Sequence, residues 1–108
     1  MGYKLPIPPA AKRDPRALEM IRVWLAEDKM HSVLNVGCWE GQGLDERHCW
    51  GILLADMIHH IANAHEEEYG RDPCESLRLI REAFIGEMEN PTSSRRGEFV
   101  CQRKGAPP

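Results

Sequence analysis

The chain has 108 residues, of which 42% are hydrophobic, and this size suits a single domain that buries a core without disulfide or metal staples. Its 14 Lys and Arg residues against 17 Asp and Glu residues give a formal net charge of −3, which excludes a general basic field for holding a nucleic-acid backbone. Neither a secretory signal nor an apolar run of membrane-spanning length is visible, so we expect a cytoplasmic protein without nucleic-acid or membrane partners.

The N-terminal region predicts an extended arm followed by a helix. Several prolines and the lack of a sustained period predict that residues 1–14 are extended. Asp14-Pro15 is typical of a helix start, because Asp caps free amides and Pro at the first helical position loses no hydrogen bond. Apolar residues then recur at helical spacing, which predicts an amphipathic helix over residues 15–28. They are Leu18, Ile21, Trp24 and Leu25.

Two later segments have the sequence character of strands. β-branched residues and a period of two between His31 and Trp39 predict a strand over residues 32–38. Residues 97–103, with Phe99, Val100 and Cys101, predict a short second strand. Because two strands alone make a marginal sheet, we expect a symmetry mate to extend the strand edge, which predicts a homodimer.

Two long helices are predicted between these strands. The glycine-containing loop Glu40–Asp45 ends in a capping residue, and apolar periodicity predicts a helix over residues 45–69. Asp72-Pro73, with Glu75 three residues after the cap, predicts the start of a helix over residues 73–89. Asn90-Pro91 is expected to end that helix.

These elements predict the α+β fold class, with three helices packed on a small one- or two-stranded antiparallel sheet that extends across a dimer. The expected organisation is an extended N-terminal arm at residues 1–14, a single α+β domain at 15–103 and a flexible tail at 104–108. The two helices at 45–69 and 73–89 are expected to form an antiparallel pair.

One helix carries the polar cluster with the most chemical interest. Its candidate site residues are Asp56, His59, His60, Asn63 and His65. The helical angles separate the three histidines, and only Asp56 and His60 have the spacing of a close pair. A metal ion needs three or four convergent ligands, so we predict neither a metal nor a catalytic site within one subunit, and no cofactor. The alternative is a metal-binding protein or an enzyme that uses the polar stripe Asp56, His60 and Asn63.

The remaining reactive residues form no recognised pattern. The four cysteines, at positions 38, 49, 74 and 101, show no CxxC pair and no zinc-type Cys/His spacing. We predict reduced, mostly buried packing thiols. Cys49 lies near a helix start, where a thiol can be reactive, but packing is the preferred interpretation. Nucleic-acid binding through Arg13, Arg16, Arg95 and Arg96 is disfavoured by the net charge.

Several segments together resemble the bacterial domain family of unknown function DUF5076. They are LPIPPAA, ALEMIRVWLAEDKMHSVLNVGCW, WGILLADMIHHIANA, IREAFIGEMENPTS and GEFV. The resemblance covers about Leu5 to Val100 and rests on the order of the segments. It implies a small bacterial α+β protein and no known activity. We therefore favour a non-catalytic interaction or regulatory module that self-associates and has an unidentified protein partner.

Overall fold

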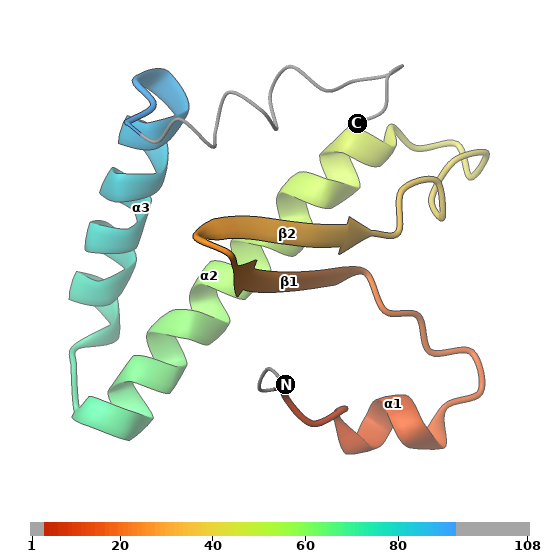
Figure 1. The fold of residues 1–108 in the computed structure, drawn as a ribbon, viewed down its shortest axis with the longest axis horizontal. Helices are drawn as coiled ribbons and strands as arrows, with labels where there is room; N and C mark the ends of the chain where they lie inside the picture. The colour runs from red at the N-terminus through yellow and green to blue at the C-terminus, as the bar shows by residue number, and fades with distance from the viewer. Residues whose placement is uncertain (1–3, 93–108) are drawn as a thin grey trace. The chain divides into compact units, whose positions relative to one another are not determined.

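The computed structural model describes residues 4–92, which form three helices and a two-stranded antiparallel sheet and confirm the α+β class (Figure 1). In chain order the elements are α1 (Pro9–Arg13), β1 (Ile21–Ala26), β2 (Lys29–Leu34), α2 (Glu46–Tyr69) and α3 (Pro73–Glu89). The chain divides into two units, one ending at Cys38 and the other beginning at Trp39. The first unit contains α1 and the β-hairpin, and the second contains α2 and α3.

A two-residue turn builds the β-hairpin of the first unit. Glu27 and Asp28 both have positive φ, 54° and 61°, as a type I′ turn requires. This turn matches the natural twist of the strands on either side of it. The antiparallel register runs from Ile21 opposite Leu34 to Ala26 opposite Lys29.

The helix predicted over residues 15–28 is wrong, because β1 occupies much of this segment. Asp14 does accept a hydrogen bond from the Arg16 N–H (2.9 Å), but its backbone oxygen also accepts one from Ala17 (3.0 Å), which closes a turn. The apolar residues at 18, 21, 24 and 25 recur at helical spacing. Those at 21, 23 and 25 also alternate with the period of two that is typical of a strand. Pairing with residues 29–34 decides between the two periods, since the strand can form only where a partner strand is available.

The N-terminal arm predicted as extended contains a short helix. Residues 4–8 have no regular structure, but α1 follows, with Pro8 as its N-cap and Pro9 at the first helical position. Proline is well accommodated there because its missing N–H would have no intrahelical partner. The expectation of an extended conformation is therefore wrong for residues 9–13.

The strand predicted over residues 32–38 corresponds to β2, displaced toward the N-terminus. β2 begins at Lys29, directly after the turn, and ends at Leu34. Asn35 continues the ladder by one hydrogen bond, from its N–H to the Met20 oxygen (3.0 Å), and Gly37 has a φ of 109° that ends the extended run. The second strand predicted at 97–103 lies outside the described residues.

The helices predicted at 45–69 and 73–89 are confirmed, and the two helices contact each other. The Asp45 side chain caps α2 by accepting the Arg47 N–H, and Gly70, with φ 68°, ends the helix in the left-handed conformation that glycine adopts without strain. In α3, Pro73 stands at the first position as expected. However, the Asp72 side chain makes no capping hydrogen bond, and Glu75 pairs with Arg78 instead.

Few apolar side chains of the described residues are fully buried. Among residues 4–92, Ala62 is the one buried hydrophobic residue, with 1% exposure. Among the apolar residues of α2, Leu54, Met57 and Ile61 are exposed. The described part of the chain therefore presents apolar side chains that a core would normally cover.

Candidate functional site

The polar stripe of α2 faces solvent. Asp56, His60 and Asn63 are exposed, as is His59, whereas His65 is half-buried. Across residues 4–92, no three His, Cys, Asp or Glu side chains lie close enough to share a metal ion. The prediction that this stripe holds neither metal nor substrate remains a prediction.

His65 belongs to a separate contact at the end of α2. Its Nδ1 lies 3.0 Å from the Arg71 Nη1, and its ring is tilted against that of Tyr69 at 5.5 Å between centroids. The Arg71 guanidinium carbon also lies 4.6 Å from the Tyr69 ring centroid, a cation–π geometry. These contacts hold the residues after α2 against its last turn.

The cysteines differ from the expectation of mostly buried thiols. Cys38 and Cys49 are half-buried and Cys74 is exposed, while Cys101 lies outside the described residues. Cys38 Sγ lies 3.8 Å from Met20 Sδ within the first unit. Burial is therefore wrong for Cys74 and only partial for Cys38 and Cys49, and the reduced state of the cysteines remains a prediction.

Two of the four arginines named for nucleic-acid binding lie within the described residues. Arg13 ends α1 and Arg16 follows in the turn, and both are exposed. Arg95 and Arg96 lie outside the described residues. The expectation that the chain does not bind nucleic acid remains a prediction.

A buried carboxylate at the start of α2 was not identified from the sequence. Glu46 is only 4% exposed, and its two oxygens accept hydrogen bonds from the Trp39 backbone N–H (3.2 Å) and the Trp50 indole N–H (2.9 Å). The two indole rings meet edge to face with centroids 5.6 Å apart. A buried charge needs such donors, and here the donors attach the loop before α2 to its first turns. We interpret this cluster as structural, since both oxygens are used within the fold.

The neighbouring Asp45 makes a pH-dependent contact with Arg47. Side-chain and backbone hydrogen bonds from Arg47 lower the pKa of Asp45 from 3.8 to about 2. The contact between Asp45 and Arg47 therefore stabilises the folded state at pH values above the ordinary pKa of Asp45. This contribution is lost as the pH falls from about 4 to about 2. We expect carbon-detected NMR titration to give a midpoint near 2, and Arg47→Ala to move it toward 3.8. Arg71→Ala, which removes a distant arginine, should leave it unchanged; an equal shift would contradict this assignment.

The β-hairpin has one apolar face. Side chains alternate along a strand, so the register places the same set of residues on one side of the sheet. They are Ile21, Val23 and Leu25 of β1 with Met30, Ser32 and Leu34 of β2. Leu25 is 80% exposed, Leu34 51% and Val23 49%. This group of exposed apolar side chains makes the face a candidate interaction surface.

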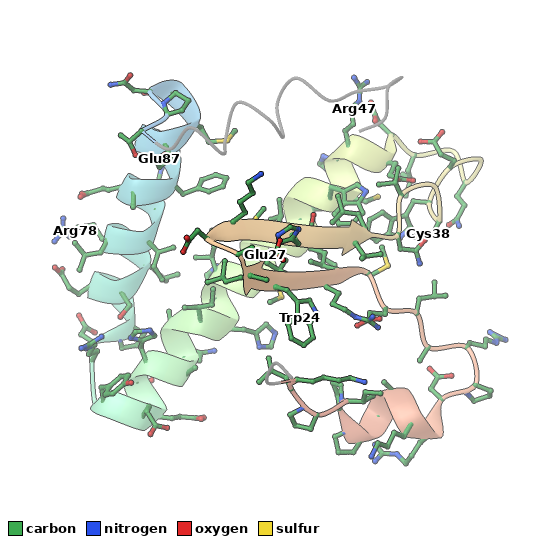
Figure 2. The ribbon with its side chains drawn as sticks, in the orientation of Figure 1. Trp24, Glu27, Cys38, Arg47, Arg78 and Glu87 are labelled. Atoms are coloured by element: carbon green, nitrogen blue, oxygen red, sulfur yellow. The ribbon has the colours of Figure 1, made fainter. Side chains whose placement is uncertain are left out.

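An open groove runs along β1. It has a volume of about 870 Å³ and is lined by the arm at residues 4–8, by Ala17–Glu19 and by all six residues of β1. Because residues from both faces of β1 line it, the groove follows the edge of β1 that is not paired with another strand of residues 4–92, which we call the free edge. Figure 2 shows Trp24 projecting from this strand. The groove and the apolar face together form the candidate site, which we call the β1 surface.

The described residues define a small α+β protein with a two-stranded sheet. The chain belongs to the family described as "Domain of unknown function (DUF5076)", whose family model matches residues 4–92, and this confirms the resemblance seen in the sequence. Comparison with curated proteins gave no match. None of the helices within residues 4–92 is long and apolar enough to cross a membrane.

A solved structure from the photosynthetic bacterium Rhodopseudomonas palustrus CGA009, named "putative pyruvate dehydrogenase", is similar to this chain. The TM-score is 0.61 at 23% identity, and the match covers 87% of this chain and 91% of that one. Similarity at this level of identity shows a shared fold and assigns no reaction to this chain.

Proposed function

We propose that the protein is a non-catalytic interaction or regulatory module of the cytoplasm that works as a homodimer. The observation that carries the proposal is the exposed apolar face of the hairpin, together with the edge of β1 that pairs with no other strand of residues 4–92. The competing function, a metal-binding protein or enzyme built on Asp56, His60 and Asn63, has less support. Those side chains are exposed on one helix rather than convergent in a pocket.

The energetics of the hairpin favour association. An isolated two-stranded sheet is marginal in water and needs further strands or packing to be stable. Fully burying an aliphatic side chain contributes about 1.5–3 kcal/mol, so covering Val23, Leu25 and Leu34 would offset much of the cost of association. A second copy is the most common partner that supplies such cover, since most soluble oligomers are symmetric dimers.

Self-association is tested by size-exclusion chromatography with light scattering on the untagged full chain. At tens of micromolar we expect twice the 12.3 kDa mass of one chain, with the monomer appearing on dilution. Standard stable interfaces bury about 1,600 Å² in total, an area that a sheet edge and one apolar face can provide. A monomer at every concentration would contradict the proposal.

A further inference from the structure

The free edge of β1 has a self-complementary sequence. We propose that β1 pairs with β1 of a second copy, antiparallel, about a two-fold axis at Val23, so that two hairpins form one four-stranded sheet. This inference rests on the proposed self-association and specifies its interface. The argument follows from which backbone groups point outward, which register they allow and which side chains then meet.

The hydrogen-bond pattern of the hairpin identifies the outward groups. Asn35 donates to Met20 across the ladder, so Met20 and Asn35 form a hydrogen-bonded pair. In an antiparallel ladder such pairs alternate, which assigns Arg22, Trp24 and Ala26 to bonds with β2. The N–H and C=O groups of Ile21, Val23 and Leu25 therefore point to the free side. They are the groups that a second strand would bond.

These three residues restrict the register of a symmetric pair. A two-fold axis perpendicular to the sheet keeps each side chain on its own face, so a residue with outward groups must lie opposite another such residue. Centring the axis on Val23 pairs Val23 with itself and Ile21 with Leu25 of the second copy. The outward N–H and C=O groups of all three residues then have hydrogen-bond partners on the second copy. A shift of the register by one residue would remove these partners.

The same register brings complementary side chains together on both faces. On the apolar face, Ile21, Val23 and Leu25 meet their counterparts and join the apolar residues of the two β2 strands. On the other face, Arg22 lies opposite Trp24 of the second copy in a non-hydrogen-bonded pair, where side chains approach most closely. An arginine against an indole is a favourable cation–π pair. Glu19 already holds the Arg22 guanidinium (Nε to Oε2, 3.2 Å) beside this edge.

A second copy fits the β1 edge better than it fits the edge of β2. The strands within residues 4–92 are β1 and β2 themselves, so a further strand for either edge comes from another segment or another molecule. On β2 the corresponding register places Ser32 against itself and His31 against Val33, and the strand begins with Lys29, a residue typical of protected edges. The groove of about 870 Å³ also lies along β1 and not along β2.

Cysteine cross-linking tests the register directly. The variant Val23→Cys, made with serine at positions 38, 49 and 74 and with Cys101 retained, should form a 23-to-23 disulfide between two copies on mild oxidation. Ser32→Cys in the same background is the matched control, because Ser32 lies directly opposite Val23 on the other strand. We expect at least tenfold more cross-linked dimer for Val23→Cys than for Ser32→Cys, with the bonded peptides identified by mass spectrometry.

The other outcomes separate this inference from the proposed function. A light-scattering dimer that cross-links at Ser32 but not at Val23 would overturn the β1 pairing and leave self-association standing. A 23-to-101 disulfide in place of the 23-to-23 bond would overturn it too, because the C-terminal segment would then occupy the edge. A monomer without either cross-link would overturn both.

Hydrogen exchange on the unmodified protein provides a test that needs no substitution. The amides of Ile21, Val23 and Leu25 should exchange at least tenfold more slowly at dimer concentrations than after dilution to monomer. The amides of Met30, Ser32 and Leu34, on the outer side of β2, serve as the internal comparison and should change much less. Equal changes on both edges would contradict pairing at β1.

Discussion

Replacing Glu46 by alanine is expected to lower the free energy of unfolding by about 3 kcal/mol. The substitution removes the acceptor for both the Trp39 N–H and the Trp50 indole N–H. Buried donors left without an acceptor cost about 1–3 kcal/mol each, and these two are partly buried, so each should contribute toward the lower end of that range. The buried volume of the glutamate is lost as well. Urea unfolding followed by circular dichroism measures the change, because tryptophan fluorescence would itself respond to the altered cluster.

Two control variants separate the effect of losing the buried hydrogen-bond acceptor from the effect of losing the negative charge. Glu46→Gln keeps one acceptor oxygen, so its loss should be intermediate between wild type and alanine. Glu67→Ala removes an exposed glutamate from the same helix and should change stability by less than about 0.5 kcal/mol. If Glu46→Ala and Glu67→Ala were equally stable, the Glu46 hydrogen bonds would have no structural importance.

Placing a carboxylate at Val23 should weaken dimerisation by at least about 100-fold, which corresponds to about 2.8 kcal/mol. In the proposed register Val23→Asp sets two like charges directly opposite each other and removes apolar contact at the axis. Sedimentation equilibrium of the full chain measures the dissociation constant. Circular dichroism should show that the monomeric variant keeps α2 and α3, which belong to the other unit of the chain.

Ser32→Asp is the matched control for this second prediction. It introduces the same charge at the position opposite Val23 on β2, so any cost to the hairpin itself is similar. We expect its dissociation constant to stay within about threefold of wild type. If the two variants weakened the dimer equally, the effect would reflect the hairpin fold rather than pairing at β1.

The sequence predicted the second half of the described chain well. Local signals mark both ends of α2 and α3: Asp45 and Gly70 enclose one helix, and Pro73 and Asn90 the other. Capping residues, a first-turn proline and a left-handed glycine act within a few residues of the chain, so they can be recognised without the tertiary structure. The stripe of Asp56, His60 and Asn63 was placed on α2 for the same reason.

Only the tertiary structure decided the first half. Residues 18–25 fit a helical and a strand period equally, and the choice was made by hydrogen bonds to residues 29–34 across the Glu27-Asp28 turn. The burial of Glu46 could likewise not be predicted from the sequence. Its hydrogen-bond donors lie seven residues before it and four after it, and neither separation belongs to a known motif. A strand and a buried charge both depend on partners that the chain must first bring together, whereas a helix end depends on its own neighbours.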